Sequence, residues 1–162
     1  MQSLRQWGIK RRMTEKVLWS IELCYLAVCA SSDVKTGMIS VRLSIGCGLC
    51  GIGIKVLAAL AEGNGLSAIM VSDWMTDVMP GLAAMLAAGI SHGAFGMGDA
   101  WMILVSCILS GGLEGCRMLW HAFVLGGIYG AWNLFRKKKC RTDTFPFAPY
   151  MLAAHMLRIC GY

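Results

Sequence analysis

The hydrophobic positions of this chain fall into six blocks separated by charged or turn residues. The blocks are apolar on all sides rather than along one stripe, which is typical of helices that lie in lipid. The predicted blocks are residues 17–32, 43–61, 78–95, 100–112, 118–135 and 147–160. A helix needs about 20 apolar residues to cross a bilayer, so the shorter blocks predict tilted or partly unwound helices. We therefore expect an all-α, polytopic transmembrane bundle of about six helices (17–162), preceded by a basic segment (1–16).

The composition supports a membrane protein. Of 162 residues, 57% are hydrophobic and only 15% are charged, which lies outside the usual range of soluble domains. The net charge of +6 comes from basic residues gathered at both ends and in one loop. Membrane proteins place their charges in this way, so the charge disfavours a nucleic-acid partner.

The basic residues leave the orientation in the membrane open. The loop from Arg136 to Arg141 is strongly basic, and the positive-inside rule places such a loop in the cytoplasm. Alternation from that loop puts both termini outside, together with the basic residues before position 17. The Lys and Arg residues then divide into seven inside and seven outside, with Lys55 inside the second block. Charge alone does not choose between the two orientations.

The eight cysteines do not predict a metal site. Most lie within or beside apolar blocks, where Cys behaves as a small hydrophobic residue. Cys47 and Cys50 form a single Cys-x-x-Cys pair without the second pair that a zinc finger needs. We expect structural thiols and no metal.

Two aspartates give the strongest chemical signal. Asp33 follows the first apolar block and Asp99 precedes the fourth, and alternation puts both on the same side of the membrane. An ionisable residue at membrane depth is costly, so its default interpretation is functional, although a residue just past a helix end is also explained as a solvated interfacial charge. Gly96 and Gly98 stand just before Asp99, and glycines allow the backbone to approach another helix closely.

Other polar residues within the blocks have plainer interpretations. Glu22 and Lys55 lie deeper in their blocks, and we expect them to pair with each other or to line a polar cavity. Neither His92, His121 nor His155 has the surroundings of a Ser-His-Asp triad. We interpret His92 as a helix-end residue, with tuning of the Asp99 site as the minority interpretation.

Three segments in order resemble one family. The segments are Asp33-Val34-Lys35-Thr36-Gly37-Met38-Ile39, Gly96-Met97-Gly98-Asp99 and Phe145-Pro146-Phe147-Ala148-Pro149. Together they resemble the motifs of the type IV prepilin peptidases and preflagellin peptidases, which are intramembrane aspartic peptidases. The resemblance runs from residue 33 to residue 153 and covers most of the chain.

The resemblance implies a role for several residues. Asp33 and Asp99 match the two catalytic aspartates, Gly96 and Gly98 match the backbone that positions the second one, and Lys35 matches the base after the first. The chain departs from the family at three places: Ile39-Ser40-Val41 stands for Ile-Pro-Asn, Trp101 for a frequent Lys, and Ala148 for Gly. The chain also lacks the paired Cys-x-x-Cys region of the larger members, so the resemblance implies the short, peptidase-only form, without methyltransferase activity or a cofactor.

Two neighbouring carboxylates share a proton and so supply an acid and a base together. One would activate a water molecule, and the other would polarise the scissile carbonyl. By resemblance, the substrate is the short basic leader of a pilin-like precursor, cleaved at the cytoplasmic face of a bacterial or archaeal cell membrane. Components of a pilus or secretion assembly are the further partners that the resemblance suggests.

Two alternatives remain open at this point. In one, the chain is a subunit of an ion-coupled transporter or channel, with Asp33, Asp99, Glu22 and Lys55 on a proton path. That alternative does not require the two aspartates to approach each other. In the other, the chain is a non-catalytic membrane scaffold that descends from a peptidase.

Overall fold

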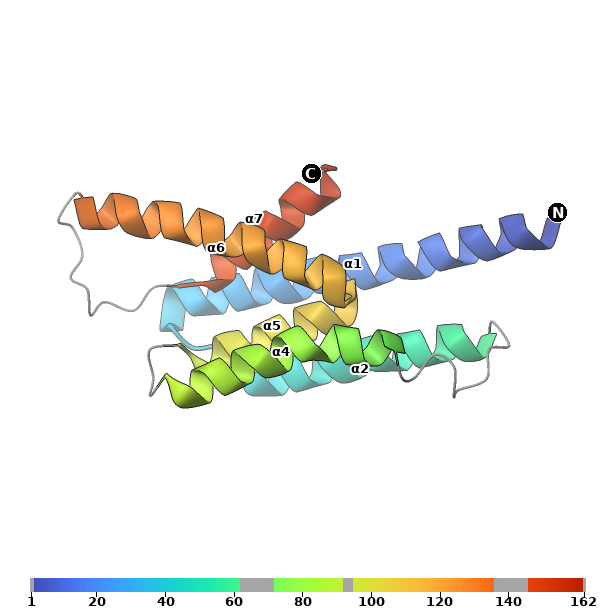
Figure 1. Cartoon of the computed structure of the whole chain (residues 1–162), viewed down its shortest axis with the longest axis horizontal. Coiled ribbons are helices and arrows are strands. Elements are labelled where there is room, and N and C mark those ends of the chain that lie inside the picture. The colour runs from blue at the N-terminus through green and yellow to red at the C-terminus, as the bar shows by residue number, and fades with distance from the viewer. Residues whose placement is uncertain (1, 62–71, 92–94, 136–145, 162) are drawn as a thin grey trace.

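The fold was analysed in a computed structural model, which describes residues 2–61, 72–91, 95–135 and 146–161 (Figure 1). The described residues form helices joined by turns and contain no strand. The helices are α1 (Gln2–Thr36), α2 (Val41–Ala61), α4 (Ser72–Ile90), α5 (Met97–Ser110), α6 (Gly112–Phe135) and α7 (Ala148–Ile159). The all-α part of the fold prediction is thereby confirmed.

Each described helix contains most of one apolar block, but several helices begin before their block, and the third and fourth blocks run past the ends of α4 at Ile90 and α5 at Ser110. Helix α1 starts at Gln2, so the backbone of the basic segment continues into the first block without a break. Helix α4 starts six residues before the predicted position 78, and α6 starts six residues before position 118. The added turns carry polar residues, among them Asp77 and Glu114, which form bonds between or along the helices. The basic loop from Arg136 to Arg141, and His92, lie outside the described residues.

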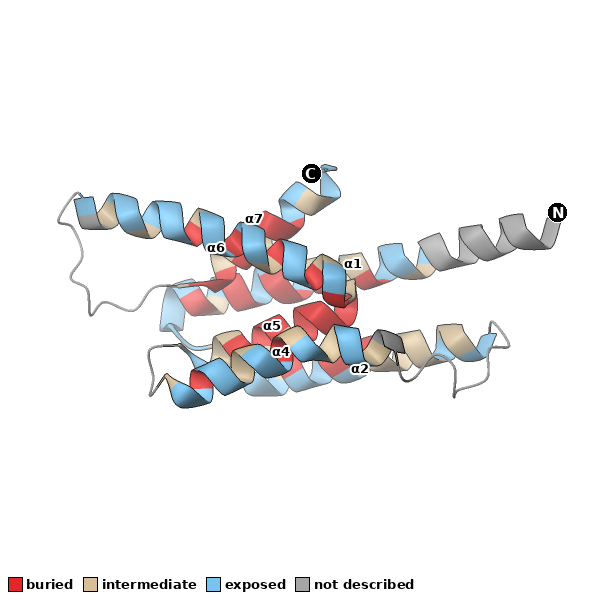
Figure 2. Cartoon of the chain, viewed as in Figure 1, coloured by how far each residue is buried: buried red, intermediate tan, exposed pale blue. Residues whose placement is uncertain are grey.

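Two of the described helices are long and apolar enough to cross a bilayer, over Met13–Thr36 and Val41–Ala61. The apolar stretches Trp74–Ile90 and Met97–Ser110 are shorter. Many residues on the outward faces of the helices are exposed, as the pale blue in Figure 2 shows, and a large share of them have large apolar side chains. On α4, the exposed residues Met75, Met79, Leu82, Leu86 and Ile90 recur at helical spacing. An exposed apolar surface of this kind is unfavourable in water and is typical of faces that contact lipid or another protein.

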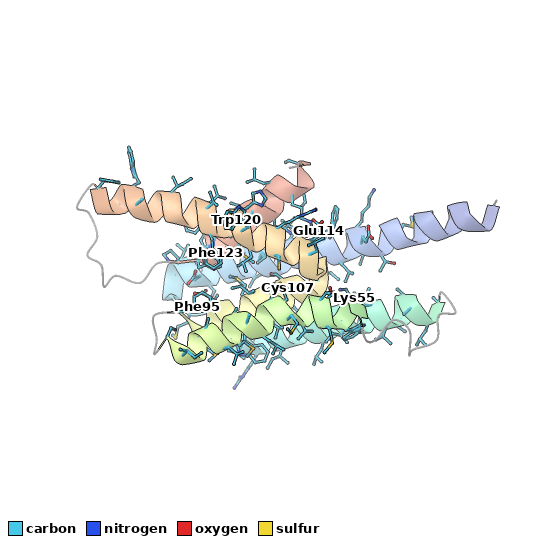
Figure 3. All side chains as sticks on the ribbon, viewed as in Figure 1. Lys55, Phe95, Cys107, Glu114, Trp120 and Phe123 are labelled. Carbon is cyan, nitrogen blue, oxygen red and sulfur yellow. The ribbon has the colours of Figure 1, made fainter. Side chains whose placement is uncertain are left out.

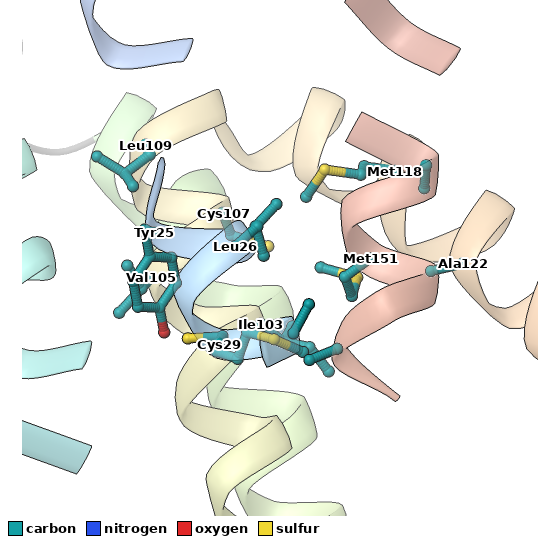
Figure 4. Close-up of a cluster of buried hydrophobic side chains, with 14 of the residues drawn as sticks. Tyr25, Leu26, Cys29, Ile103, Val105, Cys107, Leu109, Met118, Ala122 and Met151 are labelled. Atoms are coloured by element: carbon teal, nitrogen blue, oxygen red, sulfur yellow. The ribbon is translucent and has the colours of Figure 1, made fainter. Parts of the chain in front are cut away.

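The core lies where α1, α5, α6 and α7 meet (Figure 4). Helix α5 is the most enclosed element, and eight of its fourteen residues are buried. Leu26 from α1, Ile103 from α5 and Met151 from α7 are at most 1% exposed and lie in this cluster. Close packing of these side chains fixes the middle of α5 against α1 and the first turns of α7.

Glycines bring α2 and α4 close to α5. A Cβ atom added at Gly51 would lie 2.5 Å from Cδ2 of Leu109, and one added at Gly81 would meet the backbone of Leu104. Small residues permit this approach, as they do between membrane helices. Glycines on α2 and α4 therefore allow both helices to pack closely on α5.

Candidate functional site

The end of α1 places Asp33 inside the bundle. The residue is 9% exposed, one turn before the helix ends at Thr36. Gly37 ends the helix with a φ of 65°, and its N–H donates to the carbonyl oxygen of Asp33 over 2.9 Å. The left-handed conformation is one that glycine adopts at no steric cost, so Gly37 is the helix-terminating signal. The hydroxyl of Ser32 then donates to the carbonyl of Met38 and holds the turn.

The carboxylate of Asp33 is bound by the start of α7. The backbone N–H of Ala148 donates to Oδ2 of Asp33 over 3.1 Å, although the two residues are 115 positions apart. Ala148 is the first residue of α7, and Phe147 before it offers no side-chain cap. Asp33 thus takes the place of an N-cap and satisfies an N–H group that has no partner within the helix. The negative carboxylate also faces the positive end of the α7 dipole.

The start of α5 brings Asp99 to the same end of the bundle. Gly96 is the N-cap of α5, and a Cβ added there would lie 3.1 Å from Oδ2 of Asp99. A Cβ added at Gly98 would lie 3.2 Å from Cβ of Ile39, in the turn after α1. The two glycines therefore leave room for the Asp99 carboxylate and for the turn that follows Asp33.

Asp33 and Asp99 lie at the same end of the bundle, where Gly98 packs on Ile39 in the turn after Asp33 and the charge of Asp33 acts on Asp99. Helices α1, α5 and α7 converge at this point in Figure 1, and Phe95, just before α5, marks the same end of the bundle in Figure 3. A partly buried pair of carboxylates with one backbone N–H donor has the groups needed to hold a proton and to activate water. Among the described residues there is no group of three His, Cys, Asp or Glu side chains that would hold a metal ion.

The other residues that the sequence singled out lie around this pair or on the surface. Lys35 is exposed in the last turn of α1. Trp101, which stands where prepilin peptidases often have Lys, is half-buried in α5. Ile39 packs against the core, and Ser40 is exposed directly before α2. Phe145 lies outside the described residues, whereas Phe147 and Ala148 are buried beside Asp33.

The predicted pairing of Glu22 with Lys55 is wrong, because each side chain bonds to another residue. Nζ of Lys55 lies 2.7 Å from Oδ2 of Asp77, whose Oδ1 accepts the N–H of Gly112 over 2.6 Å. Oε2 of Glu22 instead accepts the hydroxyl of Ser110 over 2.5 Å. Two polar groups thus lie at the end of α5 remote from Asp99, one formed by Lys55 and Asp77 and the other by Glu22 and Ser110. The labelled Lys55 and Glu114 mark this end in Figure 3.

Sequence reasoning also missed the buried position of His155. The side chain is fully buried in α7, where its Nδ1 lies 3.4 Å from Oε2 of Glu22. Arg158, one turn later, lies on the same face and contacts both Ser110 and Glu22. The available signal was the spacing of His155 and Arg158, which puts two polar side chains on one face of a short apolar helix.

The described cysteines are free thiols. Cys29 and Cys107 are buried in the core, and Cys47 and Cys50 lie on α2 without a disulfide. In comparisons with known proteins, no family model, curated protein or solved structure matches this chain.

Proposed function

We propose that the chain is a membrane-embedded aspartic endopeptidase that removes the short basic leader of pilin-like precursors. One observation carries the proposal. Three segments that are far apart in the sequence meet at a partly buried pair of carboxylates: Asp33 bonds to Ala148, Gly98 packs on Ile39, and the charges of Asp33 and Asp99 interact. These are the segments that resemble the motifs of prepilin and preflagellin peptidases.

The membrane setting is supported by the surface of the protein. Two helices are long and apolar enough to span a bilayer, and apolar side chains also cover the outer faces of α4 and α6. We propose that these faces contact lipid and that the whole bundle is inserted in the cell membrane as a multi-pass protein. The substrate helix would then reach the carboxylates from the lipid, with its basic leader at the membrane surface.

The hydrogen bond from Ala148 divides the roles of the two aspartates. A backbone N–H and the positive end of a helix dipole both stabilise an ionised carboxylate. We therefore assign Asp33 as the general base, which takes a proton from the attacking water. Asp99, next to that negative charge, would keep its proton, polarise the scissile carbonyl and then donate to the leaving amine. The mechanism requires no covalent intermediate and no metal ion.

Cleavage of a precursor tests this proposal. The chain would be co-expressed with pilin-like precursors, and processing would be followed by gel shift and by N-terminal sequencing of the product. The variants are Asp33→Asn and Asp99→Asn, which keep the side-chain size and remove the charge. Asp77→Asn is the matched control, because it makes the same change at a carboxylate that bonds helices together.

The proposal predicts cleavage at one bond by the unmodified protein and by Asp77→Asn, and none by either active-site variant. Unchanged processing by Asp33→Asn and Asp99→Asn would overturn the catalytic assignment. If a stably inserted protein cleaves no leader, while Asp99→Asn alters ion flux across vesicles, the transporter alternative replaces the peptidase. Failure of both activities, with normal assembly of a secretion complex, would favour the scaffold.

A further inference from the structure

A chain of hydrogen bonds runs through the buried polar cluster at the far end of α5. Nη1 of Arg158 donates to Oγ of Ser110 over 2.6 Å, and Ser110 donates to Oε2 of Glu22 over 2.5 Å. At the other end, Nε2 of His155 lies 3.2 Å from the carbonyl oxygen of Trp19. Between these two parts, Oε2 of Glu22 and Nδ1 of His155 are 3.4 Å apart. The cluster joins α1, α5 and α7.

Both ends of this chain have a fixed direction. Arg158 only donates, so Ser110 accepts from it and turns its own hydrogen toward Glu22. The carbonyl of Trp19 only accepts, so Nε2 of His155 must carry the ring hydrogen. In a neutral imidazole, Nδ1 then presents a lone pair, and it faces a carboxylate oxygen that also presents a lone pair. The link between Glu22 and His155 is therefore the one that lacks a hydrogen.

Burial makes this missing hydrogen costly. The side chains of Glu22 and His155 are both 0% exposed. Oε1 of Glu22, Nδ1 of His155 and Nη2 of Arg158 have no hydrogen-bond partner among the described residues. Two lone pairs held together away from water repel each other, whereas a single added proton turns the contact into a charge-assisted or neutral hydrogen bond.

We propose that Glu22 and His155 together bind one proton inside the folded protein, so that the cluster is a proton-binding site separate from the aspartate pair. Glu22 and Asp33 are 11 residues apart on α1, which is about 16 Å along a helix. The inference does not depend on the proposed peptidase activity.

The charges nearest to the pair are basic, so the proton is held by the buried contact between Glu22 and His155 and not by acidic neighbours. From α7, Arg158 lies 3.6 Å from Oε2 of Glu22, and from α6, Glu114 lies 3.9 Å from Arg158 and is paired with the exposed Arg117. Lys55 on α2 also acts on Glu22 electrostatically, but its ammonium group is bound to Asp77. Both cations act against a proton on Glu22, Glu114 offsets part of the charge of Arg158, and none of these groups supplies the hydrogen missing between Glu22 and His155.

A groove between α6 and α7 gives the cluster a path for proton exchange. The groove has a volume of about 250 Å³ and is lined by Glu114, Arg117, Met118, His121, Ala154 and Arg158. Arg158 therefore belongs both to the groove and to the hydrogen-bond chain that leads to Glu22. Arg158 only donates and keeps its proton, so a proton would reach Glu22 on water that enters from the groove beside the Arg158 side chain.

The test measures stability against pH without any substrate. In the unfolded chain, Glu and His hold no proton above about pH 7. A folded protein that retains one proton there loses stability as the pH rises, because the unfolded state binds fewer protons. We expect the unfolding equilibrium constant of the unmodified protein, measured by SDS titration in mixed micelles, to rise by up to about tenfold per pH unit above pH 7 until the proton is released.

Glu22→Gln supplies the matched variant, since its amide N–H provides the missing hydrogen without a titrating group. In Glu22→Gln, we expect the rise of the unfolding equilibrium constant above pH 7, up to about tenfold per pH unit, to disappear. In Glu15→Gln, which makes the same change at an exposed position of α1, we expect the pH dependence of the unmodified protein. His155→Asn tests the other half of the pair, and the double variant should lose no more pH dependence than either single variant. Parallel pH profiles for the unmodified protein and Glu22→Gln would overturn the proposal.

Discussion

At the scale of single residues, the positions of Gly98 and Ala148 control how closely the helix ends approach the two carboxylates. Gly98 faces the Cβ atom of Ile39, and Ala148 is fully buried against Asp33. Neither residue carries a reactive group. Each acts by its small size, because a larger side chain would separate α5 or α7 from the end of α1.

Gly98→Ala is predicted to impair cleavage. The added Cβ would lie 3.2 Å from Cβ of Ile39, so the start of α5 must shift by a few tenths of an ångström and Asp99 shifts with it. Displacements of this kind are costly for catalysis, and we expect the cleavage rate to fall about tenfold. Gly46→Ala is the control, since no atom lies within 4 Å of a Cβ at that position on α2. A rate loss of equal size in both variants would contradict this account.

Ala148→Leu is predicted to move the first turn of α7 away from Asp33. Ala148 is 0% exposed, and overpacking of a filled site costs about 1–3 kcal/mol. The hydrogen bond to Asp33 would be lost, and leader cleavage should fall at least as far as in Gly98→Ala. Ala153→Leu, an exposed change on the same helix, should leave cleavage intact. Ala148→Gly keeps the N–H donor and should remain active; an inactive but folded Ala148→Gly protein would show that the methyl group itself is needed.

At the scale of helices, the polar residues near the ends of the apolar blocks bond one helix to another. Asp77 of α4 contacts Lys55 of α2 and the first residue of α6, Gly112. This contact explains why α4 begins before its apolar block. A residue that hydropathy assigns to a loop has its charge and hydrogen bonds satisfied by neighbouring helices, and it therefore remains helical.

Lys55→Met tests the contribution of this contact. The Lys55 and Asp77 side chains are 23% and 16% exposed, so removal of one charge leaves the other poorly solvated. We expect a loss of about 2 kcal/mol in the free energy of unfolding, measured by SDS titration. The double variant Lys55→Met, Asp77→Asn should recover part of that loss, because no unpaired charge remains. Strictly additive losses would show that the two residues do not interact.

The helices were largely predictable from the sequence, whereas the polar contacts were not. Apolar blocks of helical length located all six described helices, because the exposed and the buried surfaces of these helices are both hydrophobic. The partners of Glu22 lie 88 and more residues away, at Ser110, His155 and Arg158. No local pattern encodes such a contact. The hydrogen bond from Ala148 to Asp33 was unpredictable for another reason. Its donor is a backbone N–H, which every residue except proline carries, so no residue type marks it in the sequence.

At the scale of the whole molecule, the fold has a polar site at each end of α5. Asp33, Asp99 and the start of α7 form one, and Glu22, Ser110 and His155 form the other. The apolar core lies between them along both helices, since Leu26 stands between Glu22 and Asp33 on α1 and Ile103 between Asp99 and Ser110 on α5. Helix α7 contacts α1 at both sites, through Ala148 and through His155. The relative position of α1 and α7 is thereby held at two points.

Cross-linking measures the approach of the two aspartates independently of any substrate. In a background without the native cysteines, Asp33→Cys combined with Asp99→Cys should cross-link under mild oxidation or with a short bifunctional thiol reagent. Glu22→Cys combined with Asp99→Cys is the control, because Glu22 lies about three turns away from Asp33 on the same helix. Equal yields from the two pairs, or no product from the first, would contradict a shared site.

The most direct test of the central claim is leader cleavage by the purified protein in lipid vesicles, with the product identified by mass. The account predicts one cleaved bond in the precursor, with activity retained in Asp77→Asn and abolished in Asp33→Asn and in Asp99→Asn. Cleavage that persists in either active-site variant, at the rate of the unmodified protein, would contradict the assignment of Asp33 and Asp99 as the catalytic pair.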